Sequence, residues 1–376
     1  MFAYSQQKAY HLHNCGVNGQ DRRQVRRSAV PQKMRSMLPA TTGIRAEQMD
    51  GNDCLMKILV TLVSGIGNSI LFGPTLKALR EGFPDARIDA FAYLPQFAAP
   101  FIHGDLIDRF FYYEGLGAIS ALRREKYDIS ICAFPSKLIV YNAFALIVGA
   151  RKRVTHSYAS GGFATMNWLQ NVRVPADQTL HDVDQNLNLL ESLGIAKPTH
   201  PDLFFFVPEE SDRAADEFLV ARSLVGKHLV GAHPGAGPLS WKRAPLDEFL
   251  KWIRSVQTDD SEVIVFGGPE EKQCKEELRD ALGERAHIFE GSLHNAAALI
   301  RKCNVFVTND TGLMHIASTS RSTRVVALFN GTNPIRTRPY TKNSETVVLK
   351  EDTLKYPFAR MAPRGGGKFS IGRPRG

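Results

Sequence analysis

Cysteine is scarce in this sequence and follows no pattern. The 376-residue chain has five cysteines, at positions 15, 54, 132, 274 and 303, and no two of them form a Cys-x-x-Cys pair. Disulfide frameworks and cysteine-based metal sites need closely and regularly spaced residues. We therefore expect no disulfides and no metal site, and the scattered thiols favour a reducing compartment.

Long apolar runs are also missing. A membrane-spanning helix needs roughly 20 successive apolar residues. The best stretch, residues 138–150, is shorter and lies between Lys137 and Arg151. The N-terminal residues contain no apolar signal core. The sequence thus predicts a cytoplasmic protein without a membrane span.

Net charge is nearly absent from the central part of the chain. The whole sequence carries a formal charge of +9, from 47 Lys and Arg against 38 Asp and Glu. Residues 1–55 contribute 8 − 4 = +4 and residues 355–376 contribute 6 − 0 = +6, which leaves 33 − 34 = −1 for residues 56–354. A neutral body argues against nucleic-acid binding. The two basic ends lack sustained periodicity, so we predict a disordered extension and a disordered tail.

Residues 56–208 alternate between predicted strands and helices. Apolar and β-branched runs predict strands at 58–63, 88–93, 107–113, 127–134 and 153–155. The first strand enters a glycine turn, SGIGN, whose last residue Asn68 is expected to cap a helix over 69–81. Strand, glycine turn, helix and strand open a doubly wound domain, although the turn lacks the GxGxxG spacing of a dinucleotide site.

Residues 209–354 repeat this organisation. An amphipathic helix at 181–193 and a proline-bounded linker at 198–208 precede them. Strands are predicted at 228–232, 262–266, 288–290, 304–308 and 324–329. Helices are predicted at 246–256, from the turn 267–271 to residue 282, and at 295–301. We therefore predict two Rossmann-like α/β domains, 56–208 and 209–354, that face a central cleft.

The segment 303–320, CNVFVTNDTGLMHIASTS, organises the second domain. A buried strand passes through the polar turn 309–312 into a helix, and such a turn directs free N–H groups toward an anion, most commonly phosphate. Thr311 and His315 are four residues apart and share one helix face. The structural alternative is that Asp310 or Thr311 caps the helix and that His315 is a core histidine with satisfied hydrogen bonds.

Two further glycine-bearing loops, HPGAGPLSWKR and GGPEE, follow predicted strands at the same edge. Lys242 and Arg243 supply positive charge for phosphate oxygens, and Glu270 or Glu271 can accept a hydrogen bond from a ribose hydroxyl. Each feature alone is better explained by a solvated charge, a helix N-terminus or a turn, but the three together at one edge favour nucleotide binding. The candidate binding residues are Gly235, Lys242, Arg243, Gly268, Glu270, Glu271, Asp310, Thr311, Gly312 and His315.

Four segments carry a family resemblance: HPGAGPLSWKRAP, VIVFGGPEE, VTNDTGLMHIAS and VVALFNGTNPIRTRPY. In this order they resemble glycosyltransferase family nine, the ADP-heptose:lipopolysaccharide heptosyltransferases and their relatives. Two earlier segments, KILVTLVSGIGNSILFGPTLKALREGFPDARI and HDVDQNLNLLESLGI, look like that family too, so the resemblance covers about residues 56–350. It implies a GT-B fold, with the nucleotide sugar bound in the second domain. It also implies that Lys242 contacts phosphate, that Glu270 or Glu271 contacts the nucleoside, and that residues 310–312 contact the diphosphate and sugar.

The sequence departs from the family at the first glycine turn. Relatives usually have Gly-Asp there, with the Asp as general base for the acceptor hydroxyl. Asn68 occupies this position, and an amide takes no proton at neutral pH. His181 and Asp182 are the candidate substitutes, because the family places a similar His-acid pair near the cleft; the alternative is a helix-start histidine with a capping acid. Relatives also often have Gly-Pro where this chain has Asn330-Gly331.

The resemblance implies an inverting, metal-independent glycosyltransferase without a cofactor. It would move a heptose-like sugar from an ADP-linked donor to a lipopolysaccharide-type, lipid-linked acceptor. Two interpretations of the basic ends stay open: they hold the protein near anionic lipid at the inner face of the inner membrane, or they are passive. Two alternatives remain open: a non-catalytic nucleotide-sugar-binding protein that has lost the base, and another GT-B enzyme such as a nucleotide-sugar epimerase or hydrolase. The sequence does not specify the sugar, the acceptor or the oligomeric state.

Overall fold

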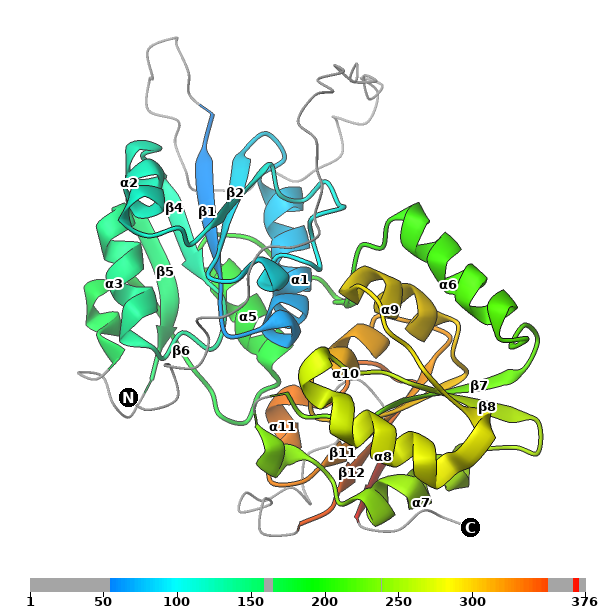
Figure 1. The fold of residues 1–376 in the computed structure, drawn as a ribbon. Helices are drawn as coiled ribbons and strands as arrows, with labels where there is room; N and C mark the ends of the chain where they lie inside the picture. Colours follow the sequence, from blue (N-terminus) through cyan, green and yellow to red (C-terminus); the bar gives the residue numbers. More distant parts are fainter. Residues whose placement is uncertain (1–54, 159–164, 238, 351–367, 372–376) are drawn as a thin grey trace. The chain divides into compact units, whose positions relative to one another are not determined.

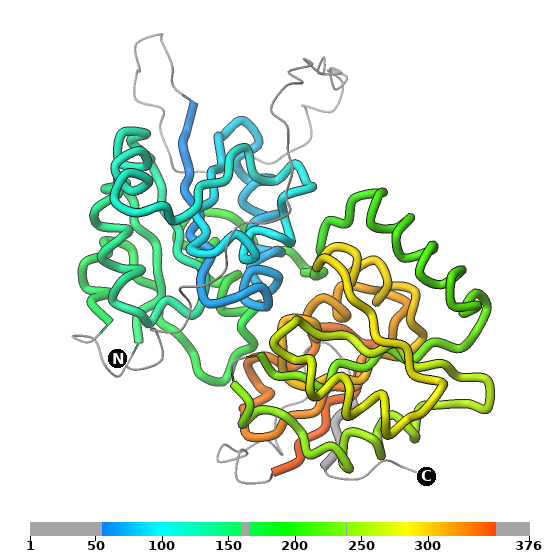
Figure 2. The backbone as a smooth tube through the Cα atoms, in the orientation of Figure 1, coloured from blue at the N-terminus to red at the C-terminus, as the bar shows by residue number. Residues whose placement is uncertain are grey.

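The computed structural model describes residues 55–158, 165–237 and 239–350, and the backbone of residues 368–371. The predicted extension lies outside these ranges except for Leu55, and so does the predicted tail except for 368–371. Figure 2 traces the chain, which completes one sheet before it begins the next. No helix within these ranges is long and apolar enough to cross a membrane.

The first sheet, sheet A, has six parallel strands in the order β3-β2-β1-β4-β5-β6 (Figure 1). Its central strands are covered on both faces, which explains why β1 is an almost continuous apolar run. The strand β6 was not predicted, because its sequence VRVP is short and contains a proline that suits an edge. The strands are β1 (Lys57–Leu62), β2 (Arg87–Ala92), β3 (Arg109–Tyr112), β4 (Ile129–Cys132), β5 (Lys152–Ser157) and β6 (Val172–Pro175).

The first helix begins earlier than predicted. Gly65, with a φ of 125°, is the N-cap residue, a backbone conformation that suits only glycine. Asn68 is therefore not the cap but lies in the first turn of the helix, where its side-chain amide donates to the carbonyl oxygen of Ser64 at 3.2 Å. The helices beside sheet A are α1 (Ile66–Gly82), α2 (Leu116–Arg124), α3 (Ile139–Val148) and α5 (Asp182–Glu191), with the 3₁₀ turns η2 (Pro95–Phe97) and η3 (Asn167–Leu169).

The second sheet, sheet B, has seven parallel strands in the order β13-β12-β11-β10-β7-β8-β9. The strands are β7 (His228–His233), β8 (Ser261–Val265), β9 (Ala286–Ile288), β10 (Val305–Asn309), β11 (Arg324–Phe329), β12 (Ser344–Val348) and β13 (Lys368–Ile371). The helices are α6 (Glu209–Ala221), α7 (Leu246–Val256), α8 (Lys272–Leu282), α9 (Leu293–Arg301), α10 (Gly312–Ala317) and α11 (Pro334–Thr337), with the turns η4 (Ser240–Lys242), η5 (Pro269–Glu271) and η6 (Gly283–Arg285).

The prediction of a disordered tail is wrong for residues 368–371. They form β13, which pairs in parallel with β12 at the edge of sheet B. Phe369 and Ile371 alternate there with Lys368 and Ser370, the period of a strand. The surrounding Gly/Pro/Arg-rich composition hides this short alternation in the sequence.

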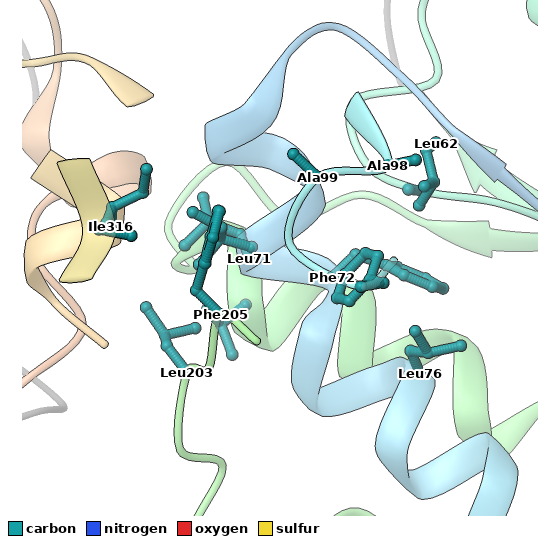
Figure 3. Packing of buried hydrophobic residues seen from close by; sticks show 14 of the residues in the cluster. Leu62, Leu71, Phe72, Leu76, Ala98, Ala99, Leu203, Phe205 and Ile316 are labelled. Carbon is teal, nitrogen blue, oxygen red and sulfur yellow. The ribbon is translucent and has the colours of Figure 1, made fainter. Parts of the chain in front are cut away.

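One buried apolar cluster joins elements of both halves of the chain (Figure 3). Leu71 and Phe72 of α1 belong to it together with Phe205, and α10 contributes Ile316. The N-terminal ends of α1 and α10 also meet, since a Cβ atom on Gly312 would lie 3.6 Å from the Cβ atom of Ile66. This packing places the first glycine turn against the turn that follows β10.

Candidate functional site

The strand order of sheet B reverses between β7 and β10, which end at His233 and Asn309. Ligands of doubly wound sheets bind at the carboxyl ends of the strands at such a reversal. Asn309 is buried and shapes the loop after β7. Its amide donates to the carbonyl oxygens of Pro234 at 2.9 Å and Gly235 at 3.0 Å, and its oxygen accepts from the N–H of Ala244 at 3.0 Å. The strand end thereby fixes the loop that carries the predicted cations.

Lys242 and Asp310 form the ionic centre of this edge. The Nζ atom of Lys242 lies 2.9 Å from Oδ2 of Asp310, and the two side chains are 20% and 7% exposed. Thr337 donates to the other carboxylate oxygen at 3.4 Å. Asp310 therefore does not cap α10, contrary to the structural alternative. An ammonium has three N–H donors, so Lys242 can be held by Asp310 and still donate to a phosphate oxygen.

Glu271 belongs to a buried chain of hydrogen bonds. Its Oε2 atom accepts from Nε2 of His233 at 3.0 Å and its Oε1 atom from the N–H of Gly237 at 2.9 Å. His233 reaches Thr311 in turn, with 3.1 Å between Nδ1 and Oγ1, so Thr311 does not use its side chain as a cap. Burial alone would raise the pKa of Glu271, but the bonds from His233, Gly237 and Gly268 outweigh it and hold the pKa at about 2. Glu271 thus orients the loop and His233 within the protein.

Arg243 and Glu270 lie outside this network. Both are exposed, and Arg243 lines a separate cavity of about 210 Å³ together with Cys274. Of the predicted acidic pair, only Glu270 is open to a nucleoside. Glycine is needed at position 235 because the backbone lies close to the side chain of Glu271: a Cβ atom there would fall 1.8 Å from Oε1 of Glu271.

The predicted His-acid pair contacts the segment around α11. His181 is the N-cap of α5: its Nδ1 atom accepts from the N–H of Val183 at 3.2 Å, and its Nε2 atom donates to the carbonyl oxygen of Arg338 at 2.9 Å. Burial lowers the pKa of His181 to about 3, so the ring is neutral with both nitrogens engaged. Asp182 accepts two bonds from Arg336, at 2.9 and 3.2 Å. Burial raises the pKa of Asp182 to about 6, although the positive charge of Arg336 acts to lower it.

His315 lies where the two turns meet. A Cβ atom on Gly67 would fall 2.6 Å from Cδ2 of the His315 ring. Burial lowers the pKa of His315 to about 4, and its Nδ1 atom is buried without a hydrogen-bond partner among the described residues. His315 is therefore not the satisfied core histidine of the structural alternative. Asn68, one residue after Gly67, is partly exposed and presents only an amide.

Sequence reasoning did not select His233, Arg336 or Thr337. His233 ends a strand at the reversal of the sheet, a position that could have identified it. Arg336 and Thr337 follow β11 in a stretch without a local pattern, so only the tertiary structure brings them to Asp182 and Asp310. No group of three or more His, Cys, Asp or Glu side chains in the described ranges is arranged to hold a metal ion.

Two parallel α/β sheets with a charged site at the reversal of the second define the class of GT-B proteins, and solved structures support this. The glycosyl transferase family 9 protein from Veillonella parvula aligns with a TM-score of 0.66 at 23% identity, covering 79% of this chain and 86% of that one. The E. coli ADP-heptose lps heptosyltransferase II aligns with a TM-score of 0.62 at 23% identity, covering 77% and 90%. The predicted GT-B fold is confirmed.

The family follows from sequence comparison. The model of glycosyltransferase family 9 (heptosyltransferase) matches residues 117–359. Lipooligosaccharide heptosyltransferase 2 of Haemophilus ducreyi is 25% identical over 334 residues, which cover 80% of this chain and 90% of the relative. The chain belongs to glycosyltransferase family 9 and is a glycosyltransferase. The resemblance inferred from the four segments is confirmed.

Proposed function

We propose that this protein transfers a heptose-like sugar from an ADP-linked donor to a lipopolysaccharide-type acceptor, with inversion and without a metal. The names of its relatives, a lipooligosaccharide heptosyltransferase and an ADP-heptose lps heptosyltransferase, support this substrate class. The observation that carries the proposal is the Lys242–Asp310 pair, 2.9 Å apart at the carboxyl end of β10. It holds a cation in place where a donor diphosphate would bind.

The leaving group is the nucleoside diphosphate. The acceptor oxygen forms a bond to the anomeric carbon while the bond from that carbon to the diphosphate oxygen breaks on the opposite face, and the electron pair stays on the diphosphate. Such a single displacement inverts the anomeric centre. The ammonium of Lys242 and the N–H groups of the turn at 310–312 would stabilise the charge that grows on the diphosphate.

The proton of the acceptor hydroxyl needs a base. Asn68 offers none, and both ring nitrogens of His181 are engaged. Asp182 has a pKa of about 6, so its carboxylate is ionised at neutral pH yet basic enough to take a proton. We assign this role to Asp182, with Arg336 compensating its charge.

Calorimetric titration with ADP, UDP and GDP tests the donor site, followed by a transfer assay. We expect selective binding of ADP by the full chain. Lys242→Ala should weaken this binding and lower turnover by about 10²–10³-fold. The matched control is Lys272→Ala on α8, a lysine with 75% of its side chain exposed, which should change neither. A folded protein that binds no nucleotide, or a Lys242 variant that behaves like the control, would refute the donor site.

The anomeric configuration of the product and the effect of a chelator test the remaining parts. NMR of the product should show inversion, and turnover should persist in EDTA. Retention of configuration, or loss of turnover that added divalent metal restores, would contradict the mechanism.

The second candidate is a non-catalytic nucleotide-sugar-binding protein, and Asn68 at the position of the family's base favours it. It predicts ADP binding that depends on Lys242, with no transfer to any acceptor and no release of sugar. Sugar release without an acceptor would instead favour a hydrolase.

A further inference from the structure

The helix α3 (Ile139–Val148) exposes apolar side chains along one side. Ile139 and Val140 are 50% and 52% exposed, and Leu146 and Ile147, about two turns later, are 40% and 46% exposed. Positions separated by seven or eight residues share a helix face. Leu138, just before the helix, is exposed too, and so is Trp168 on η3, which packs against α3. We call these six residues the α3 surface.

The α3 surface differs from isolated exposed apolar residues. On α6, for comparison, Val220 is the one large apolar residue that is exposed, and a single exposed apolar side chain is normal for a soluble protein. A contiguous patch on one helix marks an interaction site instead.

Positive charge surrounds the α3 surface. Residues 116–157 contain seven Lys and Arg against two Asp and Glu, or 7 − 2 = +5, whereas residues 56–354 sum to −1. Lys137 precedes the helix and is exposed, and Arg151 and Lys152 follow it. Arg123 of α2 donates to the carbonyl oxygen of Ile147 at 2.6 Å, which places another cation at the end of the helix.

The acidic residues of this region are already paired. Glu125 forms ion pairs with Arg87 and Arg109. Asp128 accepts from the N–H of Lys57 at 2.9 Å and lies 3.5 Å from Arg151. The net positive charge around the helix is therefore available to an external anionic partner.

We propose that the α3 surface docks on an anionic lipid bilayer, with its apolar side chains in the headgroup region and the surrounding Lys and Arg side chains on lipid phosphates. An apolar helix face flanked by Lys and Arg has the chemistry of an interfacial membrane helix. A second copy of the chain is a poorer occupant, because it would bring residues 116–157 of two copies together, each segment with a charge of +5.

The docked orientation suits the proposed reaction. Tyr141, in the first turn of α3, has its hydroxyl 3.2 Å from that of Ser64, the residue that begins the glycine turn with Asn68. Docking would thus hold this turn, where the family has its base for the acceptor hydroxyl, near the lipid surface from which a lipid-linked acceptor enters. This last step rests on the proposed function, whereas the docking itself does not.

Vesicle co-sedimentation of the full chain, without donor or acceptor, tests the docking. We expect binding to phosphatidylcholine vesicles that contain phosphatidylglycerol, weaker binding to pure phosphatidylcholine, and a decrease with salt. The double variant Val140→Ser, Ile147→Ser should partition at least about tenfold less, and Lys137→Gln about fivefold less. The matched control Val220→Ser should bind like the wild type, and melting curves should show that all variants fold.

Three results would overturn the proposal. The wild type could fail to bind anionic vesicles. The double variant could bind like the wild type, which would assign binding to the basic ends of the chain. Sedimentation in the absence of lipid could show a dimer that the double variant loses, which would make a second copy the occupant. A failed transfer assay would affect none of these measurements.

Discussion

The carboxyl edges of the two sheets present different chemistry. At the edge of sheet B, Lys242, Asp310 and Glu271 are each bound to a partner inside the protein. At the edge of sheet A, the residues after β2 and β3 are Tyr93 and Tyr113, whose rings stack 5.0 Å apart and are partly exposed. One edge is a closed polar network, and the other is aromatic and open.

This difference fits the ligands that the proposed function assigns to the two edges. A diphosphate has fixed charges, and a network that is already hydrogen-bonded holds cations and N–H groups in place for it without reorganisation. A lipid-linked saccharide has apolar and polar parts, and exposed aromatic rings provide large contacts for both. The turn after β1 in sheet A also carries Asn68, which has no carboxylate, and for this reason the proposed function assigns the base to Asp182.

The largest effect is expected from Asp182→Asn, which removes the only carboxylate assigned to the acceptor side. Turnover should fall by about 10²–10⁴-fold, while ADP binding should persist. In the wild type, turnover should rise with pH through about 6, where Asp182 ionises, and this rise should disappear in the variant. A pH–rate profile of both proteins measures it.

Restoring a carboxylate at the glycine turn provides the control. Asn68→Asp added to Asp182→Asn should recover part of the lost turnover, since it places a base where the family has one. A melting curve checks that Arg336, now unpaired, has not unfolded the protein. Wild-type turnover and an unchanged pH profile in the Asp182 variant would contradict the assignment.

Most of the fold could be predicted from sequence, because buried parallel strands are continuous apolar runs. The predicted helix at 246–256 and strand at 324–329 coincide with α7 and β11. Three strands were not predicted: β6 and β13 are short edge strands, and β12 is an inner strand whose sequence SETVV begins with polar residues. The acidic helix α6 was not predicted either, and α1 begins at a glycine with positive φ rather than at a capping side chain.

The sequence could predict which residues gather at the candidate site, but not which of them bind one another. Lys242 and Asp310 could be selected from two separate loops, yet only the fold shows that they bind each other. Glu271, one of the two candidate nucleoside contacts, is hydrogen-bonded to His233, since a carboxylate buried beside a β-strand end needs an internal partner. Sequence spacing cannot distinguish an exposed Glu270 from a buried Glu271.

A smaller effect is expected from Glu271→Gln, which tests whether the edge of sheet B is a closed network. The pKa of Glu271 is lowered to about 2, so the ionised carboxylate stabilises the fold above about pH 4.5 and loses this contribution as the pH falls toward 2. The variant should be less stable at pH 7 by about 1–3 kcal/mol, and the difference from wild type should shrink in acid. Denaturant titrations at several pH values measure this, with the exposed neighbour Glu270→Gln as the unaffected control.

An effect on stability of the same size is expected where the two edges meet, at Gly67. A Cβ atom there would fall 2.6 Å from the His315 ring, so Gly67→Ala should displace the ring or α1 and cost about 1–3 kcal/mol of stability. The matched control is Gly117→Ala in α2, where a Cβ atom meets nothing within 4 Å and alanine should be neutral or stabilising. His315 lies on α10, directly after the turn that follows β10. Gly67→Ala should therefore also weaken ADP binding, although Gly67 belongs to α1 beside sheet A. Equal stability and equal ADP affinity in the two variants would show that the edges act independently, and the contact between the turns would then have no part in donor binding.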